Sequence, residues 1–266
     1  MAHWKNAFCN ANGITLHYSR TGGDKPVLIL LHGLAASGAC WTEVAHLLGN
    51  DFDLIMPDAR GHGRSTVPVS GYGYPDHAND VIGLIHSLKL SSTILLGHSM
   101  GGMTSALAAR LYPGLFRGII LADPTFLTPE MQQEVYTSDL ASQHQSLSGK
   151  TFEELVSDLR KRHPHRSSQT IETIARARLQ TALAAFDVLT PPLPDYKTLV
   201  SALKVPGLLI FGDKGVITSR VAGETQRINP LFRSEQIPEA GHGLHYDQPA
   251  RFAAVIRSFI LSMAVL

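Results

Sequence analysis

The chain has 266 residues, of which 44% are hydrophobic and 17% charged, and its formal net charge is +1 at pH 7. This composition favours one α/β domain with an insertion, and the balanced charge argues against a nucleic-acid partner. Two cysteines, Cys9 and Cys40, give no disulfide framework, and the first residues lack the apolar stretch of a secretory signal. No apolar run approaches the roughly 18 residues of a membrane helix, so we expect a cytoplasmic protein that makes no membrane contact.

The first half of the chain alternates strand and helix patterns. Residues 14–18 alternate apolar and polar side chains after the turn pair Asn12-Gly13, which predicts an antiparallel edge hairpin. Continuous apolar runs predict buried parallel strands, at residues 27–31, 52–56 and 93–96. Helical patterns follow these strands, at residues 41–48, from about residue 76, and at 105–112.

The second half departs from this alternation and then returns to it. A strand at 118–122 stops at Asp123-Pro124, and residues 125–196 contain helical patterns (129–140, 152–162 and 171–186) without a convincing strand. We therefore expect a helical cap at 125–196 inserted into a core domain of residues 1–124 and 197–266. Strands at 207–211 and 234–237 and helices at 221–228 and 249–263 complete the predicted core.

The segment around Ser99 predicts the chemistry. Gly97-His98-Ser99-Met100-Gly101 follows a buried strand and precedes a helix, which is the pattern of a nucleophile elbow. The two glycines, which lack a Cβ atom, allow the helix to pack close to the strand while the serine takes a strained conformation. Ser99 is therefore the candidate nucleophile.

Four motifs in a fixed order support a family resemblance. They are His32-Gly33, the run from Asp58 to Ser65, Gly97 to Gly102, and Gly241-His242. With them the chain resembles the α/β-hydrolases with a helical lid over nearly its whole length. The resemblance implies a mostly parallel eight-stranded sheet with helices on both faces, and a triad in the chain order nucleophile, acid, histidine. It does not fix the substrate.

An imidazole that accepts the serine proton has to complete this site. We expect His242 to be this base, because its place before Pro249 resembles that of the family's catalytic histidine, while His245 lines the pocket or anchors the loop. The backbone N–H groups of Leu34 and Met100 are the expected oxyanion donors. Three other histidines, His32, His62 and His98, are expected to order their own turns by hydrogen bonding. We also expect His32 to lie at the substrate site.

The acid departs from the common pattern of the family. Most relatives carry it in a G-x-x-D segment, but Gly212-Asp213-Lys214-Gly215 has glycine at that position. Asp123 resembles the acid of those haloalkane dehalogenases and lactonases that carry it after the preceding core strand. We favour Asp123, with Asp213 as the alternative.

A serine at the elbow argues for acyl transfer. Apolar cap side chains, among them Phe126, Leu127 and Tyr136, indicate a small to medium apolar substrate, and we expect hydrolysis of a carboxylic ester or lactone through an acyl-enzyme. No histidine shows metal-ligand spacing, so we expect no bound metal. We also expect no cofactor, and a protein that is a monomer or a homodimer.

Three other activities remain open on this scaffold. One is hydrolysis of a C–C bond in aromatic degradation, for which cap arginines are the candidate carboxylate ligands: Arg160, Arg162, Arg166, Arg176 and Arg178. The second is a cofactor-free haloperoxidase or perhydrolase, which shares the same triad. The third is a ligand receptor without catalysis.

Overall fold

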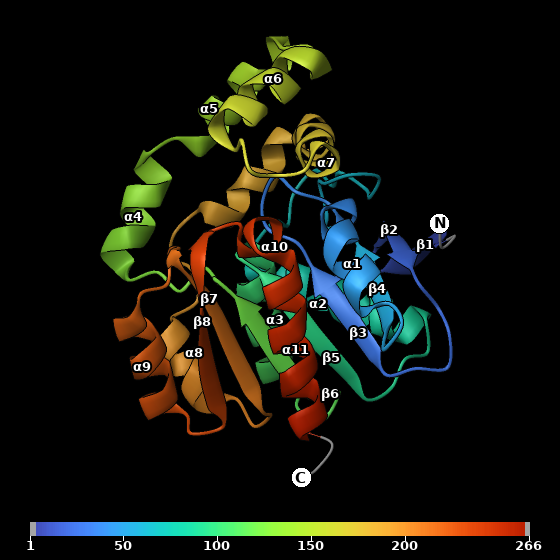
Figure 1. Ribbon diagram of the computed structural model, residues 1–266, viewed down its shortest axis with the longest axis vertical. Helices are drawn as coiled ribbons and strands as arrows, with labels where there is room; N and C mark the ends of the chain where they lie inside the picture. Colours follow the sequence, from blue (N-terminus) through green and yellow to red (C-terminus); the bar gives the residue numbers. More distant parts are fainter. Residues whose placement is uncertain (1–3, 264–266) are drawn as a thin grey trace.

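A mostly parallel sheet of eight strands organises the protein, as the sequence predicts (Figure 1). The computed structural model describes residues 4–263. The strands lie in the order β1-β2-β4-β3-β5-β6-β7-β8, with antiparallel pairing only at β1-β2 and β2-β4. Their bounds are β1 Lys5–Ala11, β2 Ile14–Arg20, β3 Val27–Leu31, β4 Asp53–Pro57, β5 Thr93–His98, β6 Phe116–Ala122, β7 Gly207–Lys214 and β8 Phe232–Gly241.

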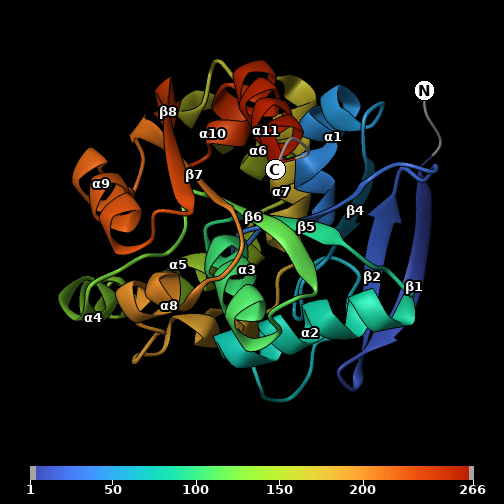
Figure 2. The ribbon, with the colours of Figure 1, turned by 90° about the horizontal axis from the view of Figure 1, so that it is seen from below.

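Helices cover both faces of this sheet (Figure 2). One face carries α1 (Thr42–Leu48) and α11 (Pro249–Met263), and the other carries α2 (Tyr74–Ser87), α3 (Met100–Leu111) and α8 (Tyr196–Ala202). Helix α9 (Ser219–Ile228) packs beside β8, and the short α10 (Leu244–Asp247) follows β8.

The continuous apolar sequence of the central strands follows from burial on both faces. In β3, Ile29 and Leu31 belong to the hydrophobic cluster that includes α2 and α3, while Leu28 and Leu30 belong to the one that includes α1 and α11. Successive side chains of a strand point to opposite faces, so a strand covered on both sides needs apolar residues at every position.

The edge hairpin forms at the predicted turn. Asn12 and Gly13 both have positive φ, at 48° and 77°, and β1 and β2 pair from Ala11 and Ile14 outward. Such a two-residue turn matches the right-handed twist of the flanking strands, which explains the preference for the Asn-Gly pair.

The cap between β6 and β7 differs from the sequence prediction in two of its helices. Its helices are α4 (Pro129–Thr137), α5 (Leu140–Gln145), α6 (Phe152–Arg162) and α7 (Ser168–Leu179), with 3₁₀ helices at Ser146–Gly149 and Leu183–Leu189. The predicted helix at 129–140 is interrupted because Asp139 is left-handed, with φ of 51°. The predicted helix at 171–186 ends at Leu179, because the N–H of Ala182 bonds to the carbonyl of Gly61 in the core.

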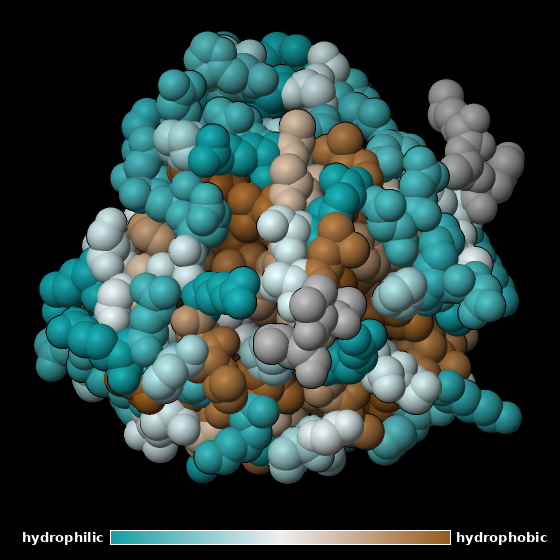
Figure 3. Space-filling model, turned by 60° about the horizontal axis from the view of Figure 1, so that its bottom comes forward, coloured by the Kyte–Doolittle hydropathy of each residue, from teal (hydrophilic) through white to brown (hydrophobic). Residues whose placement is uncertain are grey.

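The described helices include none that is both long and apolar enough to span a bilayer. On the face shown in Figure 3, apolar areas lie scattered among hydrophilic side chains. Exposed apolar area of this kind is normal for a protein surface.

The elbow depends on a very close approach of backbone segments. A Cβ atom at Gly101 would lie 2.2 Å from the carbonyl oxygen of Leu31, and one at Gly97 would lie 2.0 Å from that of Gly101. Both distances are below any van der Waals contact, and in both cases the neighbour is backbone. These two glycines therefore set the distance between β5, β3 and α3.

We expect Gly101→Ala to lower the free energy of unfolding by at least about 1–3 kcal/mol, since the backbone must move to admit the methyl group. Gly223→Ala in α9 is the matched control, because its Cβ would meet nothing within 4 Å. That variant should gain about 0.5–1 kcal/mol from helix propensity. Urea unfolding followed by circular dichroism measures both, and equal stability of the two variants would contradict the steric argument.

Candidate active site

Ser99 lies at the tip of the turn between β5 and α3 in a strained conformation. Its φ of 52° and ψ of −116° fall where residues with a side chain are uncommon. Its N–H donates to the carbonyl of Ala122 at 3.0 Å, which ties the turn to the end of β6. Strain of this kind costs on the order of 1–3 kcal/mol and persists only where the surrounding packing enforces it.

A chain of hydrogen bonds runs from Ser99 through His242 to Asp123. The Oγ of Ser99 is 3.0 Å from Nε2 of His242, and Nδ1 of His242 is 2.6 Å from Oδ2 of Asp123. A carboxylate accepts, so Nδ1 carries the proton and the Nε2 lone pair faces the serine hydroxyl. The side chain of His242 is 43% exposed while that of Asp123 is fully buried.

The Asp123 carboxylate is held by backbone donors as well. Its two oxygens accept from the N–H groups of Val216 and Ile217, each at 2.8 Å. A Cβ atom at Gly215 would lie 2.8 Å from both carboxylate oxygens. Gly215, at the position where the family resemblance leads us to expect the acid, thus leaves room for the carboxylate of Asp123.

Asp213, the alternative acid, does not bond to His242. Its side chain is exposed and accepts from the N–H of Ala240 at 3.0 Å. Backbone hydrogen bonds from Glu239 and Ala240 hold the pKa of Asp213 below its usual value. The structure brings Asp123, and not Asp213, into contact with His242.

The turn that carries Leu34 lies directly beside the elbow. A Cβ atom at Gly33 would lie 3.2 Å from Cβ of Ser99 and 2.9 Å from Nδ1 of His98. The N–H of Met100 is at the first position of α3, where backbone N–H groups have no partner within the helix. The two expected oxyanion donors therefore flank the serine from two different segments.

The comparison with known proteins identifies the family. A profile described as the Alpha/beta hydrolase family matches residues 28–255. The chain belongs to the α/β hydrolase family. This confirms the resemblance and the fold that it implies.

The hydrolase is similar to named enzymes over almost its full length. It is 31% identical over 258 residues to N-formylmaleamate deformylase of Pseudomonas putida, with 94% of each chain covered. It is 28% identical over 265 residues to 2-(acetamidomethylene)succinate hydrolase of Mesorhizobium japonicum, covering 93% of this chain and 92% of the relative. The crystal structure of E-2-(acetamidomethylene)succinate hydrolase superposes with a TM-score of 0.81 at 25% identity, over 97% of this chain and 99% of that one.

The turn histidines of the hydrolase form hydrogen bonds to other segments, which the sequence analysis did not predict. We expected each to order its own turn, but each also binds another segment. Nε2 of His98 lies 2.8 Å from the carbonyl oxygen of His242. The residue before Ser99 therefore holds the backbone of His242, the candidate base. His32 and His62 link the Leu34 turn to the loop after β4.

Several predicted substrate residues lie inside the protein. His32 and His245 are only 3% and 2% exposed, and both ring nitrogens of His32 already have backbone partners, which leaves this side chain no nitrogen for a substrate. Phe126 and Leu127 are 2% and 6% exposed, and Phe126 stacks on Tyr196 with ring centroids 5.0 Å apart. Tyr136 alone of this set is half exposed.

The cap of the hydrolase contains a cavity of about 380 Å³ between α4, α5 and the 3₁₀ helix Leu183–Leu189. This volume suits a small molecule. Apolar side chains dominate the lining, with two carboxylates and a threonine: Val135, Tyr136, Asp139, Leu140, Ala141, Phe186, Asp187, Leu189 and Thr190. Within residues 4–263, no group of three or more His, Cys, Asp or Glu side chains is arranged to hold a metal ion.

A clamp that the sequence analysis missed fastens the cap to the loop of His242. Arg166, between α6 and α7, forms an ion pair with Oδ1 of Asp247 at 2.8 Å, and Oδ2 of Asp247 accepts from the N–H of Gly241 at 3.0 Å. Glu43 of α1 accepts from the hydroxyl of Thr170 at 2.7 Å. No local pattern announces these pairs, because their members are 81 and 127 residues apart.

The other cap arginines are placed differently. Arg160 donates to the hydroxyl of Ser168, and the guanidinium of Arg176 lies 5.0 Å from the ring centroid of Phe152. Both side chains are exposed, as is Arg162, whereas Arg178 is half-buried. Burial lowers the pKa of Arg178, and the nearby positive charges of Arg162 and Arg166 lower it further.

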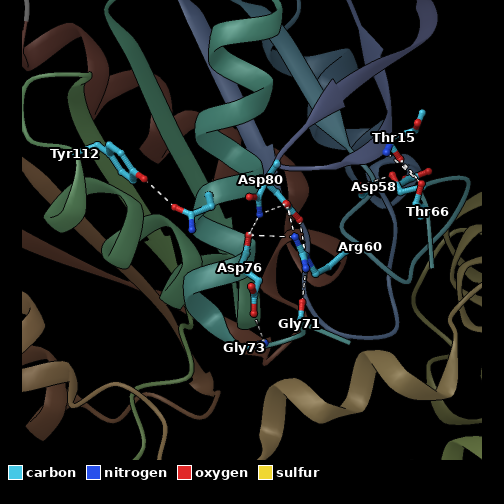
Figure 4. A network of polar contacts seen from close by, with 12 residues as sticks. Thr15, Asp58, Arg60, Thr66, Gly71, Gly73, Asp76, Asp80 and Tyr112 are labelled. Atoms are coloured by element: carbon cyan, nitrogen blue, oxygen red, sulfur yellow. Dashed lines mark hydrogen bonds and ion pairs between the residues drawn. The ribbon is translucent and has the colours of Figure 1, made fainter. Parts of the chain in front are cut away.

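A buried polar network anchors the loop after β4 (Figure 4). Arg60 forms an ion pair with Asp80 of α2, with both side chains at most 5% exposed, and also donates to the carbonyl of Gly71.

The carboxylate of Asp58, in the same loop, is also buried. Burial raises its pKa, but hydrogen bonds from His17 and from the N–H groups of Arg64 and Gly38 outweigh this effect and hold the pKa below its usual range.

The buried histidines of the hydrolase make its stability dependent on pH. Burial lowers the pKa values of five of them, His32, His62, His77, His98 and His245, and that of His77 falls to about 3. Unfolded histidines titrate near pH 6.5, so the unfolded chain binds more protons below that pH. The free energy of unfolding should therefore fall as the pH drops from about 6.5 to 5, by about 1.4 kcal/mol per pH unit for each histidine that stays neutral.

Urea unfolding at a series of pH values measures this slope. His77→Gln removes one titrating group outside the Ser99 site and should reduce the slope by about one proton. A stability that is constant between pH 6.5 and 5 would contradict the neutral state of these side chains.

Proposed function

We propose that this hydrolase cleaves carboxylic esters or lactones through an acyl-enzyme, with Ser99 as nucleophile, His242 as general base and Asp123 as the orienting acid. The observation that carries the proposal is the uninterrupted chain of hydrogen bonds from Ser99 Oγ through the imidazole to a buried carboxylate. A serine hydroxyl is a weak nucleophile on its own, and an adjacent imidazole removes its proton as it attacks.

The acylation step follows from this geometry. Ser99 Oγ bonds to the substrate carbonyl carbon while its proton passes to Nε2 of His242, and the carbonyl π electrons move to oxygen. The resulting imidazolium is stabilised by the Asp123 carboxylate at 2.6 Å. The intermediate then collapses, and His242 returns the proton to the departing alkoxide. Deacylation repeats these steps with water as nucleophile and Ser99 as leaving group.

The N–H groups of Leu34 and Met100 are the proposed donors to the oxyanion of this intermediate. They act through the backbone, so this role does not depend on the side chains of Leu34 and Met100. One such donor is worth roughly 3–4 kcal/mol of transition-state stabilisation. Because His242 carries the only proton transferred, the steps require neither a metal nor a cofactor.

The proposed substrate is a small to medium apolar acyl compound. The apolar side chains of the cap support this, among them Tyr136, Phe186 and Leu189, and the cavity that they line includes neither Ser99 nor His242 in its wall. We no longer place His32, Phe126, Leu127 and His245 in contact with substrate, because all four are at most 6% exposed. Phe126 and Leu127 instead support the cap from within the core.

Similarity to the two named relatives favours a second candidate, the hydrolysis of an acyl–nitrogen bond. The names of both relatives describe N-acyl compounds that also carry carboxyl groups. The same acyl-enzyme would form, but His242 would have to protonate an amide nitrogen before it leaves. For such a substrate, the half-buried Arg178 is a candidate partner of a carboxylate.

A panel of p-nitrophenyl esters, lactones and N-acyl compounds tests the function. Wild type should release p-nitrophenol in a burst equivalent to the enzyme concentration, followed by slower turnover, since the acyl-enzyme accumulates. Ser99→Ala should bind the same esters without a burst. The class with the highest kcat/KM assigns the substrate, and binding without any turnover across the panel would identify a receptor and contradict the proposal.

The two aspartates distinguish the acid. Asp123→Asn should lower kcat by a factor on the order of 10⁴, because the amide NH2 group donates to Nδ1 and so holds the imidazole in the wrong tautomer. Asp213→Asn is the matched control and should leave kcat unchanged. Full activity of the first variant with loss of activity in the second would transfer the role to Asp213.

A further inference from the structure

His32 makes two hydrogen bonds that fix its tautomer. Its Nε2 accepts from the N–H of Ala59 at 2.9 Å, and its Nδ1 lies 2.7 Å from the carbonyl oxygen of Gly33. A backbone N–H only donates and a carbonyl only accepts. The ring is therefore neutral, with its proton on Nδ1.

His62 repeats this arrangement from the opposite side. Its Nε2 accepts from the N–H of Ala35 at 3.2 Å, and its Nδ1 donates to the carbonyl of Arg60 at 2.8 Å. Each histidine thus receives an N–H from the other histidine's segment and donates to a carbonyl in its own. The two rings are 5.0 Å apart, edge to face.

The bonded groups lie on either side of Leu34. The carbonyl of Gly33 and the N–H of Leu34 belong to one peptide unit, so a donor on that carbonyl sets the plane in which the N–H points. The N–H of Ala35 belongs to the next peptide unit. Ala35 has φ of 57°, a conformation that a non-glycine residue keeps only when its surroundings hold it.

We propose that His32 and His62 are positioning residues for the oxyanion turn. As neutral imidazoles they hold the two peptide units around Leu34, so that its N–H points at the oxyanion before substrate arrives. The inference rests on the proposed function, since it concerns the donor to the acyl-transfer intermediate. The bond from His32 to the Gly33 carbonyl also polarises that peptide and makes the Leu34 N–H a stronger donor.

The surroundings keep both rings neutral. Burial lowers both pKa values, and His62 is further affected by the neighbouring His32 and His77, while Asp58 is the carboxylate that opposes this shift. A proton on Nε2 would place an N–H against a backbone N–H in either case. Charging one imidazole would thus break the contact between the two segments.

Two substitutions at His32 separate its two bonds. His32→Gln keeps an acceptor near the Nε2 position for Ala59 but removes the donor to Gly33, whereas His32→Asn keeps a donor near the Nδ1 position. We expect kcat to fall about 10- to 100-fold in His32→Gln, part of the effect of losing an oxyanion donor, with KM little changed. His32→Asn should recover part of this loss.

A trifluoromethyl ketone, which forms a tetrahedral oxyanion on the serine, should bind His32→Gln more weakly by the same factor as kcat falls. His17→Gln is the matched control, because His17 is 6% exposed and bonds to Asp58 of the same loop but does not touch the turn. It should keep wild-type kcat. Wild-type kcat in a folded His32→Gln, or an equal loss in His17→Gln, would overturn the inference.

The tautomers can be measured in the wild type without any variant. Nitrogen-15 spectra of the imidazoles should show His32 and His62 neutral, with the proton on Nδ1, from pH 8 down to pH 5. A charged ring or a proton on Nε2 in this range overturns the inference. These spectra need no substrate, so they contradict it independently of ester hydrolysis, whereas absence of turnover alone contradicts the proposed function.

Discussion

The buried carboxylate of Asp123 is the constraint on which the arrangement around Ser99 depends. An ionised group with no solvent exposure is costly unless hydrogen bonds replace its contacts with water. Val216, Ile217 and His242 supply the three donors, which requires the loop after β7 to turn at Gly215 and the loop after β8 to return over it. The segments that follow three neighbouring strands are therefore folded around one charge.

Hydrogen bonds from buried side chains also join the segments around Ser99. His98 holds the backbone of His242, and His32 and His62 join the segments after β3 and β4. Burial lowers the pKa values of these three imidazoles, and neutral side chains provide directional hydrogen bonds at low desolvation cost compared with charged ones. The loops at the carboxyl edge of the sheet are thus joined to one another by hydrogen bonds, and stabilisation of an oxyanion requires dipoles that are held in place.

Local signals made most of the fold predictable. Glycines around Ser99, apolar strand runs and the motif order locate the elbow and the sheet, and α6 and α11 begin and end where their patterns do. Tertiary contacts account for the failures. The helix predicted to reach residue 186 stops early because Ala182 bonds to Gly61, and the burial of His32 follows from Ala59, a partner that no spacing rule indicates.

The clamp between Arg166 and Asp247 has a consequence for how this fold can diversify. Asp247 binds the cap with one oxygen and the N–H of Gly241, next to His242, with the other. The inserted segment is thus a structural support for the core as well as a cover. A cap exchanged between relatives, by recombination or in the laboratory, would have to bring a compatible cation, or it would leave the loop of His242 without its anchor.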